Sequence, residues 1–173
     1  MGGVGKTTIA RAVYNKFARQ FEYCSFLENI KESFLTTNGD IHLQEELLSG
    51  MLKGKRRIFS ALDRGLKMVM ERLSKKNVLL VLDDVDGLDQ IETLLGKKPS
   101  FGGGSRIIIT TRDKHLVAGY VIYEPKLLSD GEALELFRQY AFRANPPSKN
   151  YDDLSRRAIK YADGLPFAFK ILI

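Results

Sequence analysis

Apolar residues follow two different spacings along this chain, and the two spacings alternate. Apolar side chains three or four positions apart predict amphipathic helices over residues 9–17, 40–52 and 60–73. Short continuous apolar runs predict strands over residues 23–30, 78–82, 106–110 and 120–124. Strands that alternate with helices favour an α/β fold built on a parallel, three-layer sheet.

The pattern changes after Pro125, where only helical spacing remains. Ser129 and Glu132 have the spacing of a capping box, which predicts a helix that starts beside them. A second helix is predicted over residues 150–162, with Gly164 as its C-terminal stop, and a third begins at Leu165-Pro166. We therefore predict a boundary near residue 127, with one domain over residues 1–127 and the first part of a helical domain over residues 128–173.

Composition and charge narrow the class of protein only slightly. The 173 residues carry a net charge of +6 and contain no run of eighteen apolar residues, so no membrane-spanning helix is expected. The single cysteine, Cys24, fits a reducing compartment, which favours a cytoplasmic protein. A basic cluster at residues 53–57 allows two interpretations, a nucleic-acid patch or a solvated connection between helices. We favour the solvated connection because no aromatic residues interleave for base stacking.

The first eight residues, MGGVGKTT, contain most of a phosphate-binding loop, G-x-x-x-x-G-K-[ST]. Glycines let backbone N–H groups turn towards phosphate oxygens, and a helix N-terminus adds its dipole. Lys6 is placed to reach the β- and γ-phosphates, the Thr7 hydroxyl to bind Mg²⁺, and Thr8 to reach the α-phosphate. The predicted nucleotide-binding residues of this loop are Gly2, Gly3, Val4, Gly5, Lys6, Thr7 and Thr8.

Charged residues follow two of the predicted buried strands. Asp83 and Asp84 come directly after the run VLLVL, where Asp83 would help to hold the metal and Asp84 would act as a general base on water. Arg112 follows the run RIIIT, and ligands bind beyond the carboxyl ends of such strands. Its guanidinium is therefore expected to contact the γ-phosphate. A solvated arginine and an acidic turn are the alternative interpretations.

Six segments in order resemble the motifs of the NB-ARC domain of plant disease-resistance proteins: GGVGKTT, SFLENIKE, LLVLDDVD, FGGGSRIIITTRDKHLV, YEPKLLSDGEALELFRQYAF and GLPFAFKIL. Asp86 and FLENIKE resemble the subclass that has an N-terminal Toll/interleukin-receptor-like (TIR) domain. The resemblance implies a switch that is closed with ADP and opens and oligomerises with ATP, with slow hydrolysis as its reset. It also implies that Pro166 packs near the adenine and that Arg112 is the sensor arginine. Phe167 stands where the family usually has leucine.

The same resemblance implies TIR and leucine-rich-repeat domains as intramolecular partners. The first loop glycine would fall one position before Met1, and the strand that leads into the loop in related ATPases is not in the sequence. We therefore expect a fragment of a nucleotide-binding domain. Another P-loop ATPase of the AAA+/STAND type, a small-molecule kinase and a nucleic-acid-binding module are the alternatives. A GTPase is disfavoured because the chain has no Asn-Lys-x-Asp segment.

Overall fold

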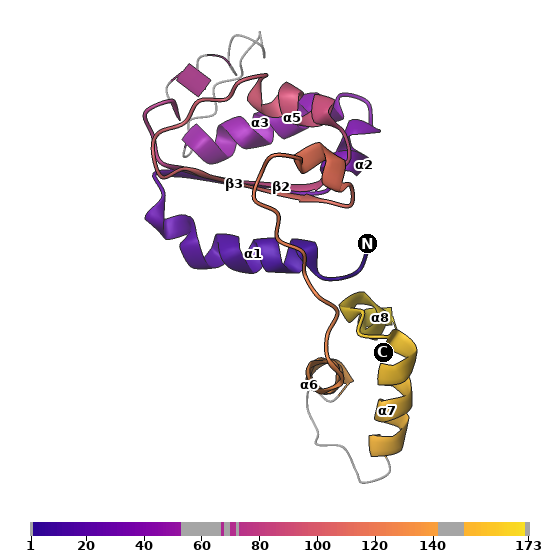
Figure 1. The fold of residues 1–173 in the computed structure, drawn as a ribbon. Coiled ribbons are helices and arrows are strands. Elements are labelled where there is room, and N and C mark those ends of the chain that lie inside the picture. The colour runs from indigo at the N-terminus through magenta and orange to yellow at the C-terminus, as the bar shows by residue number, and fades with distance from the viewer. Residues whose placement is uncertain (1, 53–66, 68–69, 72, 142–150, 172–173) are drawn as a thin grey trace. The chain divides into compact units, whose positions relative to one another are not determined.

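The structure is a computed structural model, and it describes residues 2–52, 67, 70–71, 73–141 and 151–171. It divides into two compact units (Figure 1). Residues 7–120 form the first, here called the sheet unit, and residues 1–6 with 121–173 form the second, the helical unit. The boundary expected near residue 127 stays a prediction.

Three parallel strands form the centre of the sheet unit. They are β1 (Tyr23–Leu27), β2 (Val78–Val85) and β3 (Arg106–Thr111), in the order β1-β2-β3. Figure 1 shows α1 (Lys6–Phe17) on one face of the sheet, with α2 (Ile30–Phe34), α3 (Gly39–Leu52) and α5 (Leu88–Leu95) on the other. Two short 3₁₀ turns, η1 (Ala18–Gln20) and η2 (Lys114–Val117), follow α1 and β3. The predicted three-layer α/β fold with a parallel sheet is confirmed.

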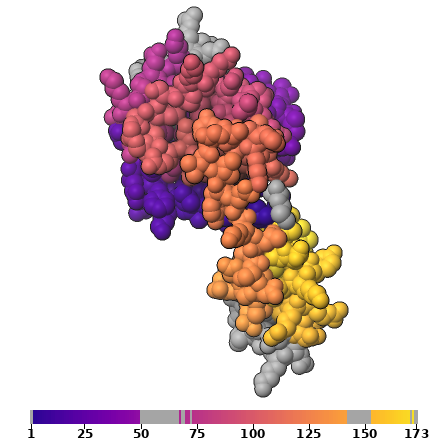
Figure 2. Space-filling view, viewed as in Figure 1, coloured from indigo at the N-terminus to yellow at the C-terminus, as the bar shows by residue number. Residues whose placement is uncertain are grey.

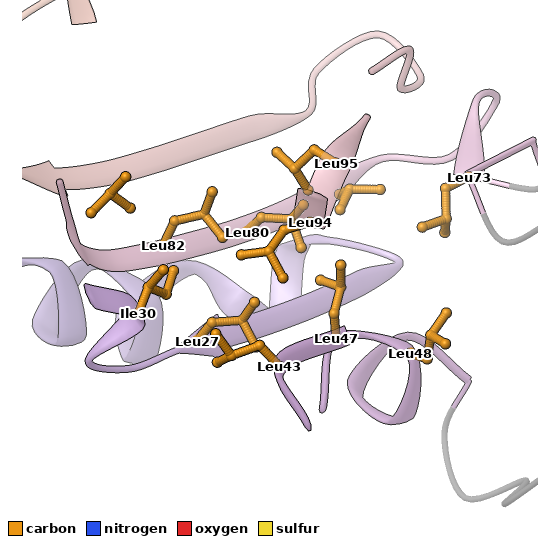
Figure 3. Close-up of a cluster of buried hydrophobic side chains, with 12 residues drawn as sticks. Leu27, Ile30, Leu43, Leu47, Leu48, Leu73, Leu80, Leu82, Leu94 and Leu95 are labelled. Carbon is orange, nitrogen blue, oxygen red and sulfur yellow. The ribbon is translucent and has the colours of Figure 1, made fainter. Parts of the chain in front are cut away.

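A leucine-rich core fixes the position of β2. Seven of its eight residues are buried, because helices cover both faces of this central strand. Figure 3 shows leucines from β2 gathered with those of β1, α3 and α5 in one cluster. Each fully buried leucine stabilises the fold by roughly 1.5–3 kcal/mol. The cluster consists of Leu27, Ile30, Leu43, Leu47, Leu48, Leu73, Val78, Leu80, Leu82, Val85, Leu94 and Leu95.

Most of the predicted elements are confirmed, although the pattern missed two short helices. The predictions of α1, α3 and the three strands are correct to within a few residues. The sequence pattern did not predict α2 or α5, which have five and eight residues and are too short for a clear periodicity. Most of the helix predicted over residues 60–73 lies outside the described residues.

The strand predicted over residues 120–124 is wrong. The structure has no strand there, and the side chains of Tyr120, Val121 and Tyr123 are exposed. Figure 2 shows this part of the chain, in orange, at the surface. A strand is stabilised by hydrogen bonds to a neighbouring strand. In the described residues the sheet consists of β1, β2 and β3, and residues 120–124 cross the division between the two units. Residues 120–124 pair with neither outer strand of this sheet, so an apolar run is not by itself sufficient for a strand.

The helical unit contains α6 (Asp130–Ala141), α7 (Tyr151–Ala162) and α8 (Pro166–Ile171), as predicted. The backbone N–H and the hydroxyl of Ser129 donate to the Glu132 carboxylate at 2.9 and 2.7 Å, which completes the predicted capping box. A small core of Ala133, Ile159, Ala162 and Phe169 holds the three helices together. In the part of the chain that the structure describes, no helix is both long and apolar enough to cross a bilayer.

Candidate nucleotide-binding site

The carboxyl end of β2 brings Asp83 to the first turn of α1. Asp83 is 1% exposed, and the Thr7 hydroxyl donates to its two oxygens at 2.9 and 3.1 Å. These two residues are 76 positions apart in the chain. The loop threonine and the strand acid, which the sequence analysis assigns to the same metal ion, are therefore neighbours in the structure.

A third side chain, Thr110 of β3, completes this arrangement, and the sequence analysis missed it. Its hydroxyl donates to Asp83 Oδ1 at 2.6 Å and accepts the backbone N–H of Asp84 at 2.9 Å. Thr110 is buried, at 7% exposure. The available signal was a polar residue at the end of the apolar run RIIIT.

Asp84 leaves the regular path of β2. Its φ is +55°, in the left-handed region that a residue with a side chain seldom adopts. This turn brings its Oδ1 to 3.4 Å from Nε of Arg112, just beyond β3. The two side chains are 31% and 67% exposed, so this ion pair contributes only about 0–1 kcal/mol to stability. The structure thus brings the candidate base and the candidate sensor together at the sheet edge.

The third aspartate of the segment LDDVD has a different set of contacts. Asp86 pairs with Lys31 at 2.9 Å and accepts a hydrogen bond from Gln90 Nε2 at 2.7 Å. The hydrogen bond from Lys31 is the main reason that the pKa of Asp86 is lowered, desolvation opposes the shift, and the hydrogen bond from Gln90 adds to it. These contacts join the loop after β2 to α2 and α5, so Asp86 supports the fold around the site.

Arg11 lies one turn beyond Thr7 on α1 and adds positive charge on this side of the sheet. It pairs with Glu28 at 2.7 Å and lies over the Phe26 ring at 4.7 Å from its centroid. The hydrogen bond from Arg11 to Glu28 is the main reason that the pKa of Arg11 is raised, and the charge of Asp83 adds to it. The Arg11 cation is therefore held mainly by Glu28.

The glycine part of the phosphate loop belongs to the helical unit. The backbone carbonyl of Gly3 accepts the N–H of Phe167 at 3.2 Å. The φ of Gly3 is +79°, and a Cβ there would lie 3.2 Å from Phe167 Cβ and 3.3 Å from Leu165 Cδ2. Glycine therefore suits this position, where a side chain would adopt an unfavourable φ and crowd the turn that leads into α8. Pro166 is the first residue of α8, a position that suits proline because its missing N–H has no helical partner.

The remaining loop residues differ in their exposure. Val4 is buried at 7%, so its side chain anchors the loop and only its backbone can face a ligand. Gly2 and Thr8 are exposed, and Lys6 is partly exposed as the first residue of α1.

Comparison with known proteins agrees with the motif order. The NB-ARC domain family matches residues 1–146. The chain is 47% identical over 176 residues to disease resistance protein RUN1 of Vitis rotundifolia and 45% identical over 179 residues to TMV resistance protein N of Nicotiana glutinosa. Both alignments cover 99% of this chain but only 13% and 15% of those proteins, so the chain spans a small part of their length. The chain belongs to the NB-ARC family, the nucleotide-binding domain found in these plant disease-resistance proteins.

Proposed function

We propose that this chain is the adenine-nucleotide switch of a plant immune receptor of the TIR class. The observation that carries the proposal is the contact between Thr7 and Asp83, at 2.9 and 3.1 Å. It joins the end of the phosphate loop to the acidic end of a buried strand, which is the juxtaposition that a nucleotide with a bound metal requires. Relatives named for disease resistance support the biological context.

The residues at the end of β2 fit a magnesium ion. Mg²⁺ prefers oxygen ligands, and the Thr7 hydroxyl and the Asp83 carboxylate supply them. An ionised carboxylate that is 1% exposed is costly unless charge and hydrogen bonds compensate. Two hydroxyl donors supply part of this compensation, and a divalent cation would supply the rest. When bound, the ion would neutralise phosphate charge as a Lewis acid.

The loop residues are proposed to bind the phosphates of ADP or ATP. Backbone N–H groups of residues 2–6 would face the phosphate oxygens, Lys6 would contact the outer phosphates, and Thr8 the α-phosphate. Pro166 is proposed to pack near the adenine. Its place beside the turn that contacts Gly3 supports this assignment, because that turn already lies against the phosphate loop.

The switch itself is assigned to Asp84 and Arg112. Asp84 is proposed as the general base that accepts a proton from water, and Arg112 as the group that senses a third phosphate. Their ion pair is long, at 3.4 Å, and Arg112 is mostly exposed. Its guanidinium could therefore leave the Asp84 carboxylate and bind a phosphate instead. Hydrolysis would be slow and would reset the switch. In the complete receptor, we place TIR and leucine-rich-repeat domains as intramolecular partners, homo-oligomerisation as the active state and the cytoplasm as the location.

The proposal is tested by the release rates of the two nucleotides. Fluorescent ADP and ATP are loaded in the presence of Mg²⁺, and their dissociation is followed by chase with unlabelled nucleotide. A switch held by ADP predicts that ADP leaves more slowly than ATP. Equal release rates for ADP and ATP would refute the switch. A preference for guanine nucleotides or RNA would instead indicate a GTPase or a nucleic-acid-binding module.

A further inference from the structure

Thr110 occupies a position at which the pairing of β2 and β3 is irregular. Leu82 pairs with Ile109 and Val85 pairs with Thr111. Between these pairs, β2 has the two residues Asp83 and Asp84, whereas β3 has Thr110 alone. Such a β-bulge places an extra residue in one strand and redirects its side chain.

The hydrogen bonds of Thr110 have a fixed direction. A backbone amide can only donate, so the Thr110 oxygen accepts the proton of the Asp84 N–H at 2.9 Å. The single hydroxyl proton of Thr110 then goes to Asp83 Oδ1, at 2.6 Å. Asp83 also accepts from Thr7, so a continuous chain of hydrogen bonds runs from the Asp84 backbone through Thr110 and Asp83 to the first turn of α1.

We infer that Thr110 is a positioning residue that sets both acids of the site through this one hydroxyl. It holds the Asp83 carboxylate against Thr7, and it holds the Asp84 backbone in the left-handed conformation that turns the Asp84 side chain towards Arg112. An effect of Thr110 on Mg²⁺ binding rests on the function proposed above. The hydrogen-bond chain does not rest on it, because it joins only atoms of the protein.

Two substitutions separate the hydroxyl from the rest of the side chain. Thr110→Val keeps the volume and the branched shape but leaves the Asp84 N–H and the buried Asp83 carboxylate without this partner. Thr110→Ser keeps the hydroxyl and loses only a methyl group. Thr111→Val is the matched control, since the Thr111 hydroxyl accepts the Asp113 N–H at 3.1 Å within the following loop.

The first measurement needs no nucleotide. Amide hydrogen exchange at Asp84 is followed by NMR in the 173-residue chain and its three variants. Loss of the hydrogen bond from the Asp84 amide predicts exchange about tenfold faster in Thr110→Val, and near-normal exchange in Thr110→Ser and Thr111→Val. An Asp84 amide that is unprotected in the unaltered chain would overturn the inference even if the valine variant does not fold.

The second measurement is the affinity for ADP with Mg²⁺ and with EDTA. We expect Thr110→Val to reduce the gain in affinity from Mg²⁺ by about tenfold, while its affinity in EDTA stays within about twofold. Thr110→Ser should keep most of the gain. Equal losses with and without Mg²⁺ would indicate a general structural effect and contradict the positioning role.

The two measurements distinguish the possible failures. If the unaltered chain binds no nucleotide, or binds it without any effect of Mg²⁺, the proposed function and the metal part of this inference are both wrong. Exchange at Asp84 then still decides whether Thr110 holds the bulge. If the unaltered chain gains affinity from Mg²⁺ and Thr110→Val gains as much, the proposed function stands and the role of Thr110 is refuted.

Discussion

Two residues of the phosphate-loop motif are held by different kinds of contact. Thr7 is held at the acidic end of β2, and Gly3 is held by the helical unit. At β2, Thr7, Asp83 and Thr110 are joined by hydrogen bonds between side chains. In the helical unit, the Gly3 carbonyl is bonded to the backbone N–H of Phe167, and glycine is required because a Cβ would crowd the turn. The first arrangement depends on which functional groups are present, and the second on the absence of a side chain.

This difference predicts two kinds of sensitivity. A side-chain network tolerates a substitution that keeps the hydrogen-bonding group and fails when that group is removed. A glycine in a close contact with positive φ is destabilised by any side chain placed there. Substitutions in the sheet unit should therefore affect metal binding and chemistry, whereas those at the glycines of the helical unit should affect stability first.

The largest effect is expected from removing the candidate base. Asp84→Asn keeps the size of the side chain and tolerates the left-handed backbone, but the amide cannot accept a proton from water. ATP hydrolysis should fall by roughly 10²–10⁴-fold. ADP affinity should stay within about twofold, because no hydrogen bond of Asp83 or Thr7 changes. Single-turnover hydrolysis and calorimetric binding measure the two quantities, and an equal loss of both would contradict the assignment of Asp84.

The next largest effect tests a glycine of the helical unit. A Cβ at Gly164, where φ is +71°, would lie 2.6 Å from the backbone oxygen of Leu128. Gly164→Ala should lower the free energy of unfolding by about 2–4 kcal/mol. The control is Gly119→Ala, at φ +92° with no atom within 4 Å of its Cβ, which should cost only about 1–2 kcal/mol. Denaturant unfolding followed by circular dichroism compares them, and equal losses would mean that the close contact is unimportant.

A smaller effect is expected when the buried acid loses its charge. Asp83→Asn presents an amide group to two hydroxyl donors and should reduce Mg²⁺-dependent ADP affinity by roughly 10–100-fold. Asp86→Asn is the matched control, because Asp86 is three residues away and pairs with Lys31 at the surface. Its ADP affinity should stay within about twofold of the unaltered chain. If both variants lose the same affinity, Asp83 has no special place in the site.

The smallest effect concerns the capping box of α6. Hydrogen bonds from Ser129 lower the pKa of Glu132 below its usual value. A lowered carboxyl pKa stabilises the fold above the pKa of the unfolded chain, and this contribution is lost as the pH falls through the folded pKa. An NMR titration should show Glu132 below the ordinary glutamate range, and Ser129→Ala should return it towards that range. An unchanged pKa in Ser129→Ala would show that the capping box does not hold the carboxylate.

Sequence predicted the parts of the site that depend on functional groups. Thr7 lies in a recognisable loop motif, and Asp83 ends an apolar run long enough to indicate a buried strand. Parallel strands bring their carboxyl ends to one edge of the sheet, so Asp84 and Arg112 are both expected at that edge. The structure has each of these residues at that edge.

Sequence could not predict the parts that depend on strand pairing and backbone conformation. Thr110 contacts Asp83 because a bulge offsets β2 from β3. The amino-acid sequence does not indicate where a bulge occurs. The contact between Gly3 and Phe167 is made by backbone atoms, which every residue shares. The apolar run at residues 120–124 has strand propensity, but it pairs with none of β1, β2 and β3, and the run itself does not encode whether it pairs.

The identity of the nucleotide that co-purifies with the chain tests the central claim most directly. The protein is denatured, and the released nucleotide is separated by chromatography and quantified against protein. We predict ADP in the unaltered chain and in the control Lys16→Ala, which removes a lysine from the last turn of α1. Lys6→Ala should release none, since its affinity falls by roughly 10–100-fold when a charged contact to phosphate is lost. An unaltered chain without nucleotide, or ADP retained equally by Lys6→Ala, would contradict the assignment of this loop as the nucleotide site.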